Sequence, residues 1–192
     1  ITLFMTLFGI AMTPFVGKLA VRTDKKTAAV AGLMFSGAAL IIFRFLDVNS
    51  VFSACIVSAV FSVGNTCYWQ LMPAMIYDVC EAEELYSGKQ RSGEVISLQA
   101  LSESLSAAAG VQLLGIILQG AGFSDEAAVQ TASALNWISN SYCLIPGLCM
   151  VLVALILSRY PINKKTYGRI IAGVEKRRRG EAVNLEDYQD IF

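Results

Sequence analysis

The sequence predicts an all-α integral membrane protein with five transmembrane helices and a polar C-terminal tail. Hydrophobic residues make up 55% of its 192 residues and charged residues only 16%, whereas soluble domains carry roughly 25% charged residues. Five stretches are long and apolar enough to cross the ~30 Å hydrocarbon core of a bilayer. Lysine and arginine gather in the connections on one side of those stretches.

The composition excludes several classes of protein. The sequence has no histidine, which rules out Ser-His-Asp catalysis, Cys-His catalysis and histidine-ligated zinc. Its formal net charge is zero, from 15 basic and 15 acidic residues, which argues against nucleic acid as a partner. The five cysteines lack zinc-like or redox-like spacing and are interpreted as small apolar groups. We therefore expect neither an enzyme nor a resident cofactor or metal.

The predicted membrane domain covers residues 1–159, and a polar tail follows at residues 160–192. The third span is the longest, reaching ~40 Å at ~1.5 Å per residue, so one of its ends should project past the hydrocarbon. The second span has only Ser36 as a polar residue in its middle, and we expect it to face lipid. The spans are expected at about residues 1–21, 27–46, 51–77, 95–120 and 136–158.

The distribution of basic residues predicts the orientation. Successive connections fall on alternate sides of the membrane, and those on one side, together with the tail, are rich in lysine and arginine. The opposite connections contain neither residue. By the positive-inside rule, the basic side and the C-terminus are cytoplasmic in a multi-pass protein of the cell (plasma) membrane. An odd number of spans with an outside start indicates a fragment, whose partners are membrane lipid and its missing N-terminal half.

Four spans carry polar residues on one helical face. The third has Ser58, Ser62, Asn65 and Trp69 at spacings of four, three and four residues. Such faces serve either helix–helix packing or a solvated pathway. Packing is the favoured interpretation for the first and fifth spans. Both interpretations remain open for the third span and for the fourth, whose polar face contains Gln99, Ser102, Glu103, Ser106 and Gly110.

Five residues on or beside these faces are candidate substrate contacts: Asn65, Trp69, Gln70, Gln99 and Glu103. The face of Trp69 suits the C–H face of a sugar ring, and the nearby amides suit its hydroxyls; core aromatic packing is the alternative. A carboxylate near the bilayer centre costs at least ~2.5–3.5 kcal/mol and normally faces the bundle interior or water. Glu103 is therefore either a substrate or gating contact or a residue in a wet cytoplasmic funnel.

Two further features point to conformational change. Pro73 removes a backbone hydrogen bond from the third span, so it is a candidate hinge or a static kink. The stretch from Asp78 to Glu94 is expected to be a loop, either simply solvated or forming a charge network with Lys25 or Lys26 in one conformation. The candidate members of this cytoplasmic gate are Lys25, Lys26, Asp78, Glu81, Glu84, Lys89 and Arg91.

The residue pattern of the tail predicts an amphipathic helix. Tyr167, Ile170, Ile171 and Val174 share one face and precede a run of four basic residues, 176–179. Such a helix lies either against the inner leaflet or against the cytoplasmic face of the bundle.

Several motifs together resemble a known family. The stretch 17–26, GKLAVRTDKK, is similar to the cytoplasmic loop G-x-L-A-D-R-x-G-R/K of the major facilitator superfamily, between its helices eight and nine; Val21 and Arg22 stand where that loop has Asp and Arg. Residues 65–78, NTCYWQLMPAMIYD, followed by GKQRSGE at 88–94, resemble the helix ten–eleven region of the glycoside–pentoside–hexuronide:cation symporters, the melibiose-permease-like branch.

The resemblance implies about helices 8–12 of a twelve-helix sugar transporter. It places Trp69 near the sugar pathway and Asp78 at the cytoplasmic end of helix ten, and it leaves the coupling Na⁺ or H⁺ site mostly outside this chain. The expected function is secondary active transport of a glycoside, pentoside or hexuronide by alternating access. A non-transporting membrane sensor, or a subunit of a larger complex with a partner-docking tail, is the alternative.

Overall fold

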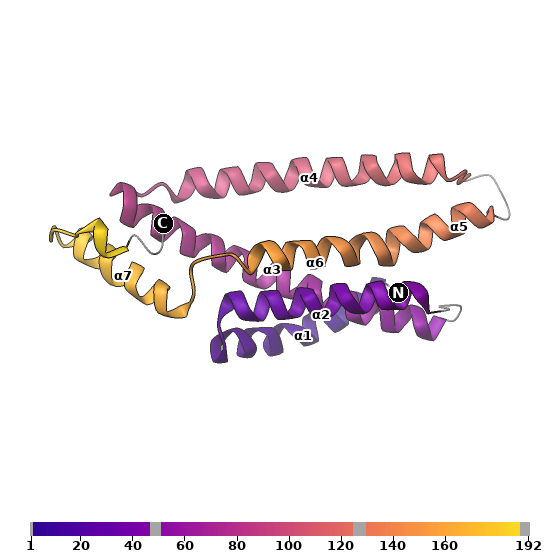
Figure 1. Ribbon diagram of the computed structural model, residues 1–192, viewed down its shortest axis with the longest axis horizontal. Coiled ribbons are helices and arrows are strands. Elements are labelled where there is room, and N and C mark those ends of the chain that lie inside the picture. The colour runs from indigo at the N-terminus through magenta and orange to yellow at the C-terminus, as the bar shows by residue number, and fades with distance from the viewer. Residues whose placement is uncertain (1, 47–50, 125–129, 189–192) are drawn as a thin grey trace.

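The computed structural model describes residues 2–46, 51–124 and 130–188, and within these ranges the chain is helical without strands (Figure 1). Five of the described helical segments are long and apolar enough to cross a membrane, which confirms the predicted fold class. The fifth joins α5 to α6 through a π-helical turn, Asn140–Leu144. The helices are α1 (Thr2–Arg22), α2 (Lys25–Phe45), α3 (Val51–Ser87), α4 (Ser92–Gly120), α5 (Ala132–Ser139), α6 (Ile145–Leu157) and α7 (Lys164–Arg178).

Helix α3 is the axis of the molecule and continues well beyond the predicted span. It has 37 residues, a length of ~55 Å against a hydrocarbon core of ~30 Å. The expectation of a loop from Asp78 onward is wrong, because α3 remains helical to Ser87 and only the short connection before Ser92 is irregular. The extension is helical because Ala82 and Leu85 lie buried against the tail.

Helix α2 does not simply face lipid, contrary to expectation. It packs against both α3 and α6 and buries one side along its whole length, leaving Phe35 and Ile42 exposed on the other. Small residues allow this close approach: a Cβ atom on Gly37 would lie 2.7 Å from the carbonyl oxygen of Gly147 in α6. The hydroxyl of Ser36 donates to the carbonyl of Val60 in α3 at 2.8 Å, which satisfies the buried polar group.

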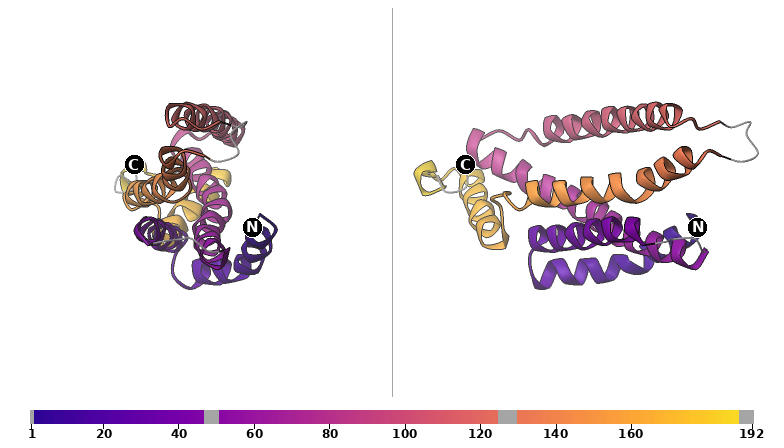
Figure 2. Two further views of the ribbon diagram at one scale, coloured as in Figure 1. Left: turned by 90° about the vertical axis from the view of Figure 1, so that its right-hand side faces the viewer. Right: turned by 45° about the vertical axis from the view of Figure 1, so that its right-hand side comes forward.

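Helices α1 and α4 lie at opposite margins of the molecule, on either side of α3 (Figures 1 and 2). No residue of α4 is buried, and α1 buries only Val16 among its described side chains. Both helices therefore expose apolar side chains, such as Leu7 on α1 and Leu105 on α4, along much of their length.

The tail folds back onto the bundle. Helix α7 lies across the extension of α3 (Figure 1) and buries Ile170 and Val174 there. The side chain of Asn163 caps its N-terminus by accepting from the backbone N–H groups of residues 165 and 166. The predicted amphipathic helix is confirmed, and its apolar face lies on the bundle.

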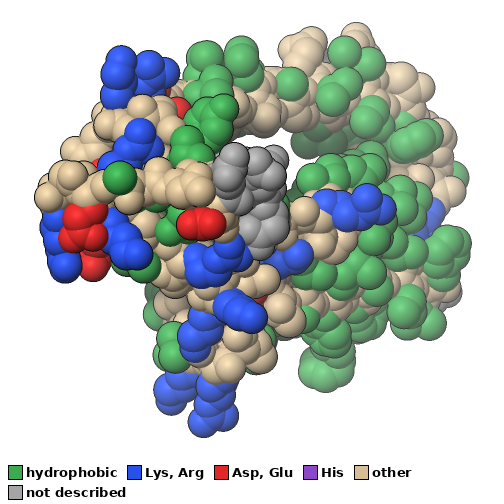
Figure 3. All heavy atoms as spheres, turned by 60° about the vertical axis from the view of Figure 1, so that its left-hand side comes forward, with side chains coloured by type: hydrophobic (Ala, Val, Ile, Leu, Met, Phe, Trp, Pro, Cys, Tyr) green, Lys and Arg blue, Asp and Glu red, His purple; other side chains and the backbone are tan. Residues whose placement is uncertain are grey.

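The two ends of the bundle differ in charge. The end formed by α7, the C-terminal part of α3 and the α1–α2 connection carries most of the lysines and arginines (Figure 3); we call it the basic end. The opposite end consists of the last turn of α2, the first turns of α3, and α5. Arg44 is the single charged residue among the described residues of this end. In contrast to the basic end, we call it the neutral end.

Candidate functional site

The polar face of α3 divides into a packed part and an open part. The hydroxyl of Ser58 donates to the Ala54 carbonyl at 2.7 Å and lies 2.9 Å from the hydroxyl of Tyr142. The hydroxyl of Ser62 donates to the Ser58 carbonyl at 2.8 Å. Both serines are buried, so they serve helix packing. One to two turns further along, Trp69 is 59% exposed and marks the open part.

A first groove runs between α1 and α3 with a volume of about 580 Å³. Its polar character comes from both helices, and the small Gly9 lets them approach, since a Cβ atom there would touch the Thr66 hydroxyl at 3.4 Å. The groove therefore offers hydroxyl and amide groups inside an apolar span. Its lining is Met5, Thr6, Gly9, Ile10 and Thr13 of α1 with Ser62, Asn65, Thr66, Trp69 and Gln70 of α3.

A second groove, of about 530 Å³, lies between α3 and α4. Its walls on α3 are mainly apolar, and α4 supplies Gln99, Ser102, Glu103 and Ser106. The amide of Gln99 donates to the Glu103 carboxylate at 2.9 Å, so the expected partner of this acid is an amide one turn away. Glu103 itself is exposed.

Trp69 stands between these grooves and lines both of them. Its ring meets the neighbouring Tyr68 edge-on, with ring centroids 5.6 Å apart. The predicted substrate residues are therefore distributed around one indole rather than within one pocket: Asn65 and Gln70 line the first groove, and Gln99 and Glu103 line the second. Pro73 lies one turn further along within the continuous α3, so a hinge there stays a prediction.

An ion pair between Lys25 and Asp78 lies at the basic end. The ammonium of Lys25 lies 2.6 and 2.9 Å from the two carboxylate oxygens of Asp78 and joins α2 to α3. It also sits over the ring of Tyr167, 4.8 Å from its centroid, which adds a contact to α7. The sequence had left this pairing open as one alternative, with either Lys25 or Lys26 as the partner. Burial and the neighbouring Glu81 carboxylate raise the pKa of Tyr167 to about 12.

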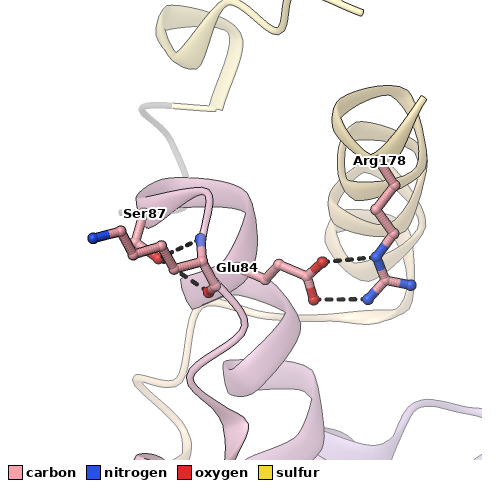
Figure 4. Close-up of polar contacts among 4 residues, drawn as sticks. Glu84, Ser87 and Arg178 are labelled. Atoms are coloured by element: carbon pink, nitrogen blue, oxygen red, sulfur yellow. Dashed lines mark hydrogen bonds and ion pairs between the residues drawn. The ribbon is translucent and has the colours of Figure 1, made fainter. Parts of the chain in front are cut away.

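The remaining acidic residues of the predicted network do not meet Lys25 or Lys26. Glu84 instead forms a bidentate ion pair with Arg178 of α7, in which both N–O distances are 2.7 Å (Figure 4). Lys89 lies in the α3–α4 connection, where its backbone N–H donates to the Ser87 hydroxyl and its carbonyl accepts from it. Arg91 pairs only loosely with Glu94, at 4.0 Å. Lys26 and Glu81 have no ion pair among the described residues.

Comparison with known proteins gives the family. Residues 1–164 match the model of a family described as MFS/sugar transport protein. The chain belongs to this family. It is 25% identical over 178 residues to a glucuronide carrier protein homolog of Escherichia coli (strain K12), a match that covers 93% of this chain and 39% of the relative. It is 22% identical over 184 residues to the uncharacterized symporter YnaJ of Bacillus subtilis (strain 168), covering 96% and 40%.

Membership of this family confirms the resemblance seen in the motifs, which is to a family of transporters rather than of enzymes. The chain spans about two fifths of the length of the curated relatives it matches.

The tail also contributes to the polar contacts at the basic end of this MFS protein, which the sequence did not predict. The guanidinium of Arg177 donates to the backbone carbonyls of Leu85 and Tyr86 in the last turn of α3. Lys164 donates to the Val21 carbonyl at the end of α1, at 3.1 Å. The only sequence signal was the basic run at 176–179, which does not reveal which helix end it covers.

Proposed function

We propose that the chain is part of a secondary transporter that moves a sugar together with Na⁺ or H⁺ by alternating access. One observation carries the proposal: an exposed tryptophan stands between two grooves that present amide, hydroxyl and carboxylate groups within an apolar span. Transporters of this kind bind substrate near the bilayer midplane and rock around it. A sugar-transport family and relatives named as a carrier and a symporter support this reading.

The chemistry around Trp69 suits a sugar of the glycoside, pentoside or hexuronide class. The indole face stacks on the C–H face of the ring, where an apolar surface is favourable. Asn65 and Gln70 on one side, and Gln99 and Glu103 on the other, offer the donors and acceptors that the ring hydroxyls require. The side-chain oxygen of Gln70 is buried and has no hydrogen-bond partner among the described residues, so a hydroxyl donor there would satisfy it.

The basic end would act as the cytoplasmic gate in this proposal. Lys25 and Asp78 join α2 to α3, and α7 ties that junction to α1 through Lys164. Breaking these contacts would let the end open. The coupling cation would bind mainly to residues outside this chain.

The alternative of a sensor with a partner-docking tail has less support. The apolar face of α7, around Ile170 and Val174, is already covered by α3. Release of α7 would be needed before a partner could use that face.

The test is uptake by the complete transporter in vesicles with an imposed Na⁺ or H⁺ gradient, using a labelled glycoside, pentoside and hexuronide. Trp69→Ala should lower the rate of the transported sugar by about tenfold or more, because the stacking surface is lost. Trp137→Ala is the matched control, since this second tryptophan lines neither groove. Equal rates for the two variants would remove Trp69 from the site. Uptake indifferent to both gradients would contradict symport.

A further inference from the structure

A further hollow lies at the neutral end, away from the two grooves around Trp69. It has a volume of about 640 Å³ and opens between the end of α2, the beginning of α3 and the segment from α5 into the π-helical turn. Its walls combine apolar rings and aliphatic groups with one cation and several neutral polar groups. The lining is Phe43, Arg44, Phe45, Leu46, Ala54, Val57, Asn136, Ile138, Ser139, Tyr142 and Cys143.

The cation in this hollow is held by neutral groups. Nε of Arg44 donates to the side-chain oxygen of Asn140 at 2.5 Å, and Nη2 donates to that of Asn136 at 2.8 Å. Among the described residues Arg44 has no carboxylate partner. A guanidinium has five N–H donors, so the two amide oxygens fix its orientation but neither neutralise its charge nor use all its donors.

The local backbone explains why both asparagines reach the arginine. Pro146 has no N–H, so the carbonyl of Tyr142 lacks its usual helical donor. The helix widens there into a π-helical turn that begins at Asn140. Such turns are frequent at functional sites. Asn136 and Asn140 are one turn apart and face Arg44 together.

We propose that the Arg44 hollow is an oxyanion-binding site, taking a carboxylate or phosphate whose apolar or ring-shaped remainder lies against Phe43, Val57 and Ile138. A pre-oriented guanidinium binds such groups through paired, charge-assisted hydrogen bonds. Two sources supply this chemistry at the end of a membrane span: the headgroup of an anionic phospholipid, or a sugar acid in solution.

The site is separate from the grooves around Trp69. The hollow shares no lining residue with either groove, and the buried Ser58 lies between them on α3. The inference therefore does not depend on the proposed sugar pathway.

The experiment measures binding to the complete transporter purified in neutral detergent. One arm counts bound phosphatidylglycerol against phosphatidylcholine by native mass spectrometry. The other titrates glucuronate against glucose by calorimetry, a pair that differs in the carboxylate. Arg44→Gln should weaken the favoured oxyanion by about ten- to a hundredfold, the range expected for hydrogen bonds to a charged group. Arg159→Gln, which removes one exposed charge near the other end, should leave that binding unchanged.

Selective phosphatidylglycerol binding that depends on Arg44 supports the site with lipid as its source. Glucuronate binding that depends on Arg44 supports it with a solute. The proposal is overturned if neither oxyanion binds better than its neutral counterpart, or if Arg44→Gln behaves as Arg159→Gln does. Should Arg44→Gln lose its fold, judged by melting temperature, Asn136→Ala with Asn140→Ala keeps the charge and should weaken binding by about tenfold.

Discussion

At the scale of single residues, the contact between Lys25 and Asp78 shows how an acidic group is kept at the edge of an apolar bundle. Asp78 is only 5% exposed, and Lys25 satisfies both of its carboxylate oxygens. A buried charge that loses its partner is costly, because neither water nor another cation compensates it. The pair therefore fixes the relative position of α2 and α3 at the basic end.

A double-mutant cycle on this pair tests that role. Asp78→Asn and Lys25→Met should each lower the free energy of unfolding by about 1–3 kcal/mol, and the double variant should lose about 1–2 kcal/mol less than the sum. Unfolding by denaturant in detergent micelles measures the free energies of the four proteins in the cycle. The control cycle uses Arg91 and Glu94, which are exposed and 4.0 Å apart, and should give a coupling near zero. Equal couplings in the two cycles would contradict the structural role of Lys25.

The sequence predicted which charged residues could pair at the basic end, but not which pairs form. The reason is physical. Charge alone allowed either Lys25 or Lys26 as the partner of the acidic stretch. Adjacent helical positions point about 100° apart, so only one of them faces α3. The partner of Glu84 was not predictable, because Arg178 reaches it only through the register of α7 against α3. For the face that carries Trp69, the polar spacing left helix packing and an open pathway as alternatives; the structure shows a packing contact at Ser58 and grooves at Trp69.

At the scale of elements, the extension of α3 and the tail helix stabilise each other. Local sequence between Asp78 and Ser87 is acidic and was expected to be a loop. Its helical form depends on Leu85 packing against Ile170 and Val174, and on Arg177 capping its last carbonyls. Helices with a continuous apolar run were predictable from the sequence. The extension of α3 was not, because its partners lie about 90 positions later in the chain.

Releasing α7 should therefore loosen the end of α3. Ile170 is fully buried, and Ile170→Asp would place a charge among apolar side chains. We expect hydrogen exchange at residues 82–87 to speed up by at least about tenfold, with little change in the middle of α3. The control is Arg179→Ala, an exposed residue whose ion pair lies within α7 itself. Unchanged protection in Ile170→Asp would show that the extension is helical without α7.

At the scale of the whole molecule, the grooves depend on α1 and α4 flanking α3 from opposite sides (Figure 2). Both flanking helices expose apolar side chains, as α4 does along its entire length. In the proposed transporter, the remaining part of the protein covers these faces and turns the two grooves into walls of one central cavity. Water must then reach Asn65 in at least one conformation, while apolar positions outside the grooves stay in lipid.

Cysteine labelling tests this claim most directly. In a complete transporter without its native cysteines, Asn65→Cys lies in the first groove, and Phe35→Cys lies on the exposed face of α2 outside both grooves. We predict that a membrane-impermeant maleimide labels position 65, that the transported sugar slows this labelling, and that position 35 stays unlabelled. A position 65 sealed from the reagent under every gradient and sugar condition would contradict it.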